Sequence, residues 1–258
     1  MKKKIKLDVV VIATLRPEIL DITLNSFYHR LLKNYNVRLI VNIDPVGEPG
    51  VTKQEVIKVC KRYFKNTLIN TPKIPSFSRA VYWCWKEVKT DIFFHLEDDW
   101  CLVSNVNNAA ALKPFSDKNV IQVRLNSTRN NKFKFNDGFA LAEVFSLNPS
   151  FFRKKYIKEK LPKFSFYRDP EKQIRYNLIS HSFSNPRLVL YGHQNQKHMI
   201  IMTGRFWREK YNFNKWVVSA QGNVIWGKKK LSCVSQLYAN SKYYFYLCFW
   251  KIRYYRFF

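Results

Sequence analysis

Three consecutive carboxylates, Glu97, Asp98 and Asp99, are the side chains of this sequence that point most directly to chemistry. Their mutual repulsion is costly unless a cation lies among them. Carboxylate oxygens are ligands that suit Mg²⁺ or Mn²⁺, and these ions usually also bind phosphate oxygens of a substrate. A metal held here would act as a Lewis acid beside a phosphorylated leaving group. The alternative is an exposed acidic turn, which the apolar strand before the cluster and Trp100 after it disfavour.

The segments before this cluster alternate between expected strands and expected helices. Buried strands are predicted at 7–13, 37–43, 67–70 and 91–96, with helices at 18–32, 52–64 and 76–88 between them. This order predicts an α/β fold with a mostly parallel sheet and helices on both faces. Ligands bind at the carboxyl ends of such strands. Polar residues stand at three of these ends, namely Thr14 with Arg16, Asp44, and the acidic cluster.

The second half of the chain has a weaker pattern. Strands are expected at 120–125, 139–145, 188–191 and 199–202, helices at 151–160 and 170–177, and a basic turn or helix at 203–211. No internal repeat or flexible linker is visible. We expect one continuous domain, with a first half at 1–103 that would bind the phosphorylated ligand, and a second half with a basic aromatic extension at 104–258 that would bind its reaction partner.

Composition narrows the class of protein. Of the 258 residues, 47% are hydrophobic and 17% aromatic, which excludes a disordered polycation. The five cysteines form no CxxC pair, which favours a reducing, cytoplasmic compartment. A lysine-rich start before an apolar segment resembles a signal peptide, but Asp8 inside that segment favours a buried strand. No apolar stretch reaches the length of a membrane-spanning helix.

Positive charge is concentrated after position 100. Residues 1–100 hold 17 basic and 11 acidic residues, a net +6, so the remaining 28 basic and 7 acidic residues give the later part +21 of the total +27. Such a field implies a polyanionic partner, which would be nucleic acid, an anionic membrane surface or a phosphorylated glycan. A diffuse charged surface from a lysine-rich genome is the alternative. Phosphate-loop and GxGxxG motifs are absent from the sequence.

The strand-plus-acid pattern FFHLEDDW resembles the DxD motif of GT-A fold glycosyltransferases, especially variants that read Glu-Asp-Asp. The segment 74–80 is similar to the helix that precedes this motif and faces the donor. VVVIATLRP resembles the first strand and the nucleotide loop of the family. The matches cover about residues 7–103. The resemblance implies a nucleotide-sugar donor, by family default a UDP-sugar, with Mn²⁺ or Mg²⁺ as cofactor.

The resemblance also implies roles for single residues. Asp99 becomes the expected metal ligand, and Glu97 and Asp98 are expected to contact the ribose or to order metal-bound water. The remaining donor-binding candidates are Thr14, Arg16, Asp44, Ser78 and Arg79. For three of them a structural alternative stays open: a surface arginine at Arg16, an Asp-Pro turn at Asp44, and a helix-surface charge at Arg79.

Acceptor-side candidates come from two later segments. Residues 145–150 and 169–173 resemble acceptor-side segments of such transferases, where a carboxylate deprotonates the attacking hydroxyl. Glu171 is the first candidate for this base and Asp169 the second, although acids near Pro170 also suit a helix start. Residues 203–208 resemble a C-terminal Gly-Arg-x-Trp segment of related enzymes. That resemblance makes His198 a candidate metal ligand, and Arg205 and Arg208 candidate phosphate or acceptor contacts.

Two hypotheses about the acceptor remain open, and a third hypothesis assumes no catalysis. The first is double-stranded DNA carrying a hydroxymethylated base, as in phage-type DNA-modifying glycosyltransferases, with the enzyme in the host cytoplasm. The second is a lipid-linked or cell-surface glycan at the cytoplasmic membrane, with the segment 242–258 in the lipid interface. That segment, which holds ten aromatic and four basic residues, also suits a C-terminal helix packed on the sheet. The third is a non-catalytic nucleic-acid-binding protein.

Overall fold

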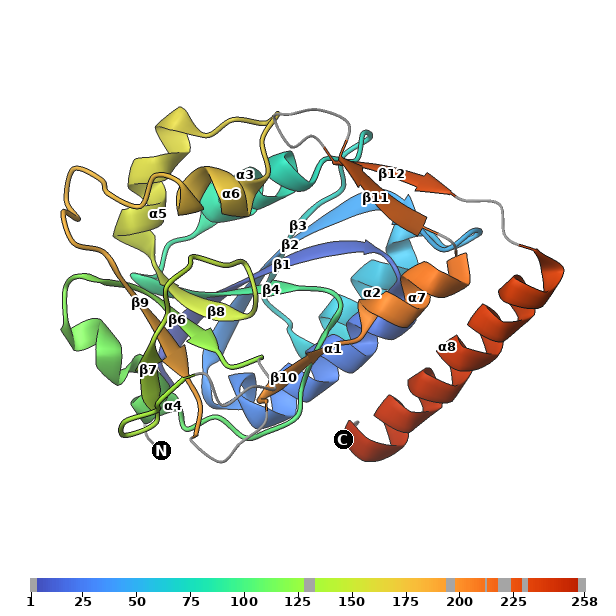
Figure 1. Ribbon diagram of the computed structural model, residues 1–258, viewed down its shortest axis with the longest axis horizontal. Helices are drawn as coiled ribbons and strands as arrows, with labels where there is room; N and C mark the ends of the chain where they lie inside the picture. Colours follow the sequence, from blue (N-terminus) through green and yellow to red (C-terminus); the bar gives the residue numbers. More distant parts are fainter. Residues whose placement is uncertain are drawn as a thin grey trace.

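The computed structural model describes residues 4–127, 133–193, 198–211, 213–217, 224–228 and 232–254. Its centre is an eight-stranded sheet with the order β3-β2-β1-β4-β8-β6-β9-β7 (Figure 1). The strands of this sheet are β1 (Lys6–Leu15), β2 (Asn36–Gly47), β3 (Thr67–Asn70), β4 (Ile92–Glu97), β6 (Val120–Leu125), β7 (Phe139–Leu141), β8 (Ser150–Arg153) and β9 (Arg187–Tyr191).

The first half of the sheet is parallel, as the sequence predicts. Strand β1 pairs in parallel with β2 and β4, and β2 pairs in parallel with β3. Strand β6 is parallel to β9, whereas β8 runs antiparallel to both β4 and β6, and β7 runs antiparallel to β9. The predicted α/β fold with a mostly parallel sheet is therefore confirmed.

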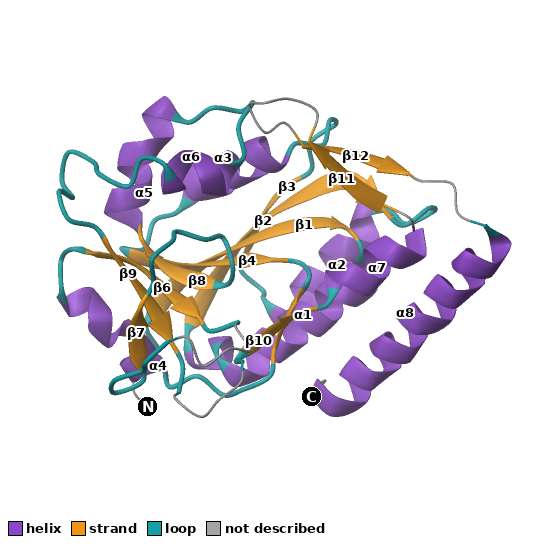
Figure 2. Cartoon of the chain, viewed as in Figure 1, coloured by secondary structure: helices purple, strands orange, loops and turns teal. Residues whose placement is uncertain are grey.

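Helices cover both faces of the sheet (Figure 2). The longer ones are α1 (Pro17–Arg30), α2 (Lys53–Tyr63) and α3 (Phe77–Glu87), and the shorter ones are α4 (Asn108–Leu112), α5 (Lys154–Lys160), α6 (Pro170–Arg175) and the 3-10 turns Leu32–Asn34, Lys113–Ser116 and Leu161–Lys163. Side chains of β1 alternate between two cores. Val9 and Val11 pack with α1 and α2, and Val10 and Ile12 pack with α3, α5 and α6.

Local sequence signals explain where these helices begin. Pro17 occupies the first turn of α1, where its missing N–H costs nothing. Thr52 and Glu55 form the predicted capping box of α2. The Ser76 hydroxyl accepts a hydrogen bond from the Arg79 backbone N–H at the start of α3. Each of these helices starts within two residues of its predicted position.

Three predicted boundaries are wrong. The strand expected at 139–145 ends at Leu141. The helix expected at 151–160 begins only at Lys154, because β8 occupies the preceding residues between β4 and β6 and buries Phe151 and Phe152 in opposite cores. The loop expected from Asp44 is still part of β2, which continues to Gly47 opposite Leu15. A Cβ at Gly47 would overlap the backbone of Leu15, so only glycine allows this pairing.

The C-terminal part adds a third layer beside α1. It consists of β5 (Trp100–Leu102) paired with β10 (Ile200–Met202), helix α7 (Gly204–Tyr211), the hairpin β11 (Phe213–Val217) and β12 (Val224–Lys228), and helix α8 (Cys233–Tyr254). Helix α8 packs on α1 and α7 through a core that contains Ile19, Trp207, Tyr243, Leu247 and Trp250. Within the described ranges, no helix is both long and apolar enough to cross a membrane.

Candidate active site

The carboxyl ends of β1 and β4 meet at Asp98. Its backbone N–H donates to Ile12 O at 3.1 Å, which continues the parallel ladder past the end of β4. Its Oδ2 accepts hydrogen bonds from the Thr14 backbone N–H at 2.8 Å and from the Thr14 hydroxyl at 2.9 Å. The topology thus brings together two of the strand ends that the sequence marks as polar.

Arg16 and Asp98 form a buried ion pair at this edge. Arg16 is only 6% exposed, and its Nε and one terminal nitrogen donate to the two carboxylate oxygens. Burial alone would lower the pKa of Arg16, but the charges of Asp98 and Asp99 raise that pKa above its ordinary value, so the guanidinium stays charged. Arg16 is therefore not a surface arginine, and the Asp98 carboxylate holds Thr14 and Arg16 at this edge. The expected contact of Asp98 with the ribose stays a prediction.

Asp99 joins the cluster to the C-terminal part of the chain. Its Oδ2 lies 3.7 Å from Nη1 of Arg16 and 3.4 Å from Nη1 of Arg208 in α7. Its carbonyl accepts the Thr203 backbone N–H at 2.7 Å, just before α7 begins. Glu97 ends β4 opposite Ile12 and is half-buried. One acidic cluster is thus bracketed by two arginines that are 192 positions apart in the chain (208 − 16).

Three residues of this edge are missed by the sequence reasoning. The Trp207 ring lies 4.9 Å from the Arg16 guanidinium carbon, and its indole N–H donates to Glu48 Oε1 at 2.9 Å. Burial raises the pKa of Glu48, and the Trp207 hydrogen bond opposes part of that shift. The Thr23 hydroxyl donates to Asp98 O at 2.7 Å. The Gly-Arg-x-Trp segment does signal this region, but only its arginines are predicted as functional.

Asp44 connects β2 to the start of α3. Its carboxylate accepts from the Asn42 amide at 2.8 Å and from the Ser76 backbone N–H at 3.1 Å. Burial raises the pKa of Asp44, while these two hydrogen bonds lower it in part. The Ser78 hydroxyl donates to Arg168 O at 2.7 Å, and the Arg79 guanidinium lies 4.7 Å from the centre of the Phe166 ring. The segment around position 168 therefore reaches the helix expected to face the donor.

Asp169 and Glu171, the two base candidates, both make structural contacts. Asp169 caps α6 by accepting the Lys172 backbone N–H at 3.0 Å. Glu171 accepts from the Ser146 hydroxyl at 3.0 Å and the Leu147 backbone N–H at 2.8 Å, and it pairs with Arg175. These contacts fix the position of the Glu171 carboxylate beside the segment 145–150.

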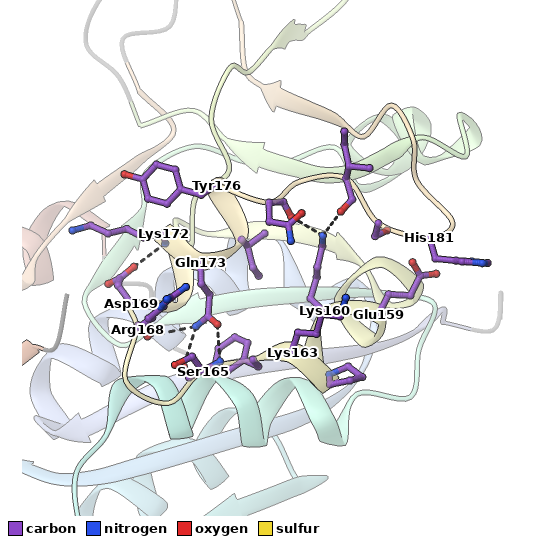
Figure 3. Close-up of a pocket in the computed structure, with 16 residues that line it drawn as sticks. Glu159, Lys160, Lys163, Ser165, Arg168, Asp169, Lys172, Gln173, Tyr176 and His181 are labelled. Atoms are coloured by element: carbon purple, nitrogen blue, oxygen red, sulfur yellow. Dashed lines mark hydrogen bonds between the residues drawn. The ribbon is translucent and has the colours of Figure 1, made fainter. Parts of the chain in front are cut away.

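A cavity of about 910 Å³ lies beside Asp169, between α5 and α6 (Figure 3). Its wall includes the cationic side chains of Lys160, Lys163, Arg168 and Lys172 together with the carboxylates of Glu159 and Asp169. The Lys160 ammonium donates to the carbonyls of Asn177 and Ile179, both at 2.6 Å, which holds the far wall together. The cavity is therefore a positively charged hollow on the side of the chain expected to bind the acceptor.

His198 does not join Asp99. The antiparallel register of β10 and β5 pairs Met202 with Trp100 and Ile200 with Leu102, which puts position 198 opposite position 104. That is five residues along the strand from Asp99 (104 − 99), or about 16 Å at the usual strand rise. The register does not bring His198 next to Asp99, and the role of His198 as a metal ligand stays a prediction. Arg205 pairs with Glu209 on the exposed side of α7, so only Arg208 of the two predicted arginines contacts the acidic cluster.

No protein-family model and no curated protein matches this sequence. Solved structures do match its fold. A mannosyltransferase from Pyrobaculum calidifontis in complex with GDP-Man and Mn²⁺ superposes with a TM-score of 0.53 at 12% identity, over 81% of this chain and 62% of that one. GalNAc-T7 with UDP, GalNAc and Mn²⁺ gives 0.51 at 10% identity, over 72% and 41%.

Staphylococcus aureus TarS, residues 1–349, gives a TM-score of 0.50 at 11% identity, over 77% of this chain and 61% of that one. The chain thus spans less than two thirds of the length of each of these structures. Identities this low carry information about architecture alone. The match in architecture, together with the mostly parallel central sheet flanked by helices, shows that the chain has the GT-A fold.

Proposed function

We propose that this protein is a metal-dependent glycosyltransferase that moves a sugar from a nucleotide-sugar donor to a hydroxyl acceptor. The observation that carries the proposal is the cluster at the carboxyl edge of the sheet, where Asp98 and Asp99 lie between Arg16 and Arg208. Ligands bind at this edge in open α/β sheets. The GT-A fold adds support, since two of the matched structures contain a nucleotide or nucleotide sugar together with Mn²⁺.

The donor set at Asp99 fits a divalent ion held through one carboxylate. Oδ1 of Asp99 is buried and accepts no hydrogen bond from the described residues, whereas Oδ2 lies beside Arg208. No group of three His, Cys, Asp or Glu side chains in the described part of the chain forms a complete metal cage. A Mg²⁺ or Mn²⁺ ion bound through one carboxylate takes its other ligands from donor phosphates and water. When bound, it neutralises the charge of the leaving diphosphate.

In this proposal, other residues of the chain bind the donor, hold the site together and accept the proton. Arg208 and the charged Arg16 attract the donor phosphates, and Trp207 holds the Arg16 guanidinium in place. Glu97 ends β4 and Asp44 lies near the end of β2, on the two sides of β1, where the ribose and base of the donor would lie. Thr14 and Asp98 hold this edge together. Glu171, with Asp169 as the second candidate, accepts the proton of the attacking hydroxyl in this proposal.

For the acceptor, the cation-lined cavity beside Asp169 favours a molecule that carries phosphate. Double-stranded DNA with a hydroxymethylated base satisfies this condition, and the net +21 after position 100 favours it. A lipid-linked glycan carries phosphate as well. Helix α8 exposes an apolar face, which favours that second acceptor because aliphatic side chains make no favourable contact with a phosphate backbone.

Thermal shift with a panel of sugar nucleotides and Mn²⁺ tests the donor side. A donor at about 100 times its dissociation constant adds about 2.7 kcal/mol to the free energy of unfolding. The shift should require Mn²⁺ and should be lost in Asp99→Asn, while the matched control Asp91→Asn, at an exposed carboxylate paired with Lys154, should keep it. If no sugar nucleotide raises the melting temperature, or if Asp99→Asn responds like the wild type, the proposal fails. A non-catalytic binder would also show no transfer of a labelled sugar.

A further inference from the structure

Helix α8 is apolar on two opposite faces, and only one of them is covered. The inner face contributes Ala239, Tyr243, Leu247 and Trp250 to the core shared with α1 and α7. The outer face carries exposed apolar side chains at helical spacing on both sides of Ser241, and these are Val234, Leu237, Tyr238, Tyr244, Phe245, Cys248, Phe249 and Ile252. We call these side chains the outer stripe. Figure 1 shows α8 at the edge of the molecule, beside α1 and α7.

The outer stripe is unusual for a water-exposed helix face. Leu237, Phe245 and Ile252 are 67%, 67% and 86% exposed, and the stripe extends from Val234 to Ile252 over about 27 Å of the helix. Scattered exposed apolar residues need no explanation, but a contiguous apolar strip marks an interaction site. A helix that is hydrophobic all round is normally buried all round, and here the burial is one-sided.

Charge identifies the partner. Helix α8 contains no acidic residue, and its basic residues Lys242, Lys251 and Arg253 stand along the margins of the stripe. Lys242 is paired with Glu209 at 2.9 Å and Lys251 lies 3.7 Å from Glu18, so both of these charges are partly compensated. The Arg253 guanidinium lies against the Phe249 and Tyr254 rings and keeps its charge at the margin of the stripe. An apolar strip flanked by cations complements a surface with anionic headgroups above hydrocarbon.

From these observations, we infer that the outer stripe of α8 docks on an anionic lipid bilayer, with the helix lying in the plane of the interface. A DNA partner fits less well, because protein surfaces that bind DNA are polar and the stripe presents aliphatic and aromatic side chains. A helix in the interface buries its apolar face about 5–10 Å into the headgroup boundary. The tyrosines of the stripe, Tyr238 and Tyr244, suit that depth, since their rings are amphipathic.

The docking face is linked to the candidate active site by α7. Lys210 donates to the Tyr244 hydroxyl at 3.0 Å, the Gln236 amide donates to Lys210 O at 2.6 Å, and the Phe206 ring stacks on Tyr246 at 3.8 Å. Arg208 of the same helix contacts Asp99. The inference thus deepens the proposed function, on which its acceptor side rests, because it places the acidic cluster one helix away from a membrane where a lipid-linked acceptor would lie.

Vesicle flotation with the full chain tests the docking surface. The wild type should float with phosphatidylcholine vesicles that contain phosphatidylglycerol and should stay in solution with phosphatidylcholine alone. Leu237→Gln/Ile252→Gln keeps helix propensity and should lower binding to the anionic vesicles by about tenfold or more. The matched control Ile5→Gln/Ile179→Gln, at residues that are each 64% exposed, should bind like the wild type. Circular dichroism confirms that both variants are folded.

Several outcomes would overturn the inference. It fails if the wild type does not float with anionic vesicles, or if the α8 variant floats as well as the control. It also fails if the α8 variant loses affinity for duplex DNA but not for vesicles, or if sedimentation shows a dimer that only the α8 variant disrupts. Because flotation needs no donor, a negative sugar-nucleotide screen with positive flotation would remove the proposed function and leave the docking surface intact.

Discussion

Gly204, the first residue of α7, packs directly on the carboxylate of Asp99, although the two are 105 positions apart (204 − 99). A Cβ at position 204 would lie 2.7 Å from Asp99 Cγ, which is closer than real Cβ atoms approach a neighbour. Gly204→Ala should therefore displace α7 from the acidic cluster. We expect a loss of about 1–3 kcal/mol of stability and a weaker response to the donor.

The matched control for Gly204→Ala is Arg205→Ala, in the same turn. Arg205 is exposed and pairs only with Glu209, one turn along α7. Its loss should change the free energy of unfolding by less than about 0.5 kcal/mol. Equal melting temperatures for Gly204→Ala and the wild type would show that α7 tolerates the added methyl group and would contradict the close packing.

The buried pair Arg16–Asp98 should be costly to break. Asp98→Asn leaves the Arg16 charge buried next to Asp99 alone, and removing one partner of such a pair costs about 3–5 kcal/mol. Arg187→Gln, which breaks the more exposed pair with Asp117, should cost less than about 1 kcal/mol. Urea unfolding of the two variants measures the difference, and similar midpoints would mean that the Arg16 charge finds compensation elsewhere.

His95 should make the protein less stable in acid. It is fully buried in β4, its Nδ1 accepts the Trp85 indole N–H at 3.3 Å, and burial lowers its pKa from 6.5 to about 3. Because the folded-state pKa lies below the unfolded-state pKa, the unfolded chain takes up the proton first. Stability is therefore full above pH 6.5 and falls as the pH drops towards 3, by about 2 kcal/mol between pH 7 and 5.

Urea unfolding at pH 7 and pH 5 measures the contribution of His95. In His95→Gln this position no longer titrates. The loss of unfolding free energy between pH 7 and pH 5 should therefore be about 2 kcal/mol smaller than in the wild type. Other titrating groups affect both proteins equally, which makes the difference between them the relevant quantity. An unchanged difference would show that His95 is protonated in the folded protein.

Glu171→Gln separates catalysis from structure at the acceptor side. If Glu171 accepts the proton of the attacking hydroxyl, its variant should lose about 10²–10⁴-fold in kcat while the donor-induced thermal shift is unchanged. Arg175→Gln removes the partner of Glu171 and controls for its structural role. If both variants lose stability and activity together, Glu171 only holds the segment at 146–147. Asp169→Asn keeps a helix cap and identifies the second candidate if it alone loses activity.

Much of the fold could be read from local pattern. The first strand is a continuous run rich in β-branched residues, and the helices of the first half have recognisable starts at Pro17, Thr52 and Ser76. The error at Phe151 and Phe152 has a physical cause. A short apolar run fits a buried strand as well as a buried helix, and only the gap between β4 and β6 decides in favour of the strand.

The candidate site also has features that the sequence predicts and features that only packing decides. The acidic triplet, its place at the end of a buried strand and its proximity to Thr14 follow from the sequence, because parallel strands must end at one edge. The sequence does not show which of the three carboxylates is available to bind a ligand. Asp98 is paired with Arg16, 82 positions away, and Asp99 contacts Arg208, 109 positions away. Contacts over such separations form only when the sheet and α7 are assembled.

The sequence by itself determined the α/β class, the acidic edge of the sheet and the excess of positive charge, because these depend on residue type and local spacing. The tertiary structure alone decided that His198 lies away from Asp99, that Trp207 covers Arg16, and that α8 buries one apolar face and exposes the other. The physical reason is that burial depends on which distant elements pack together, and helix α8 has apolar residues enough for two partners but packs on one side only.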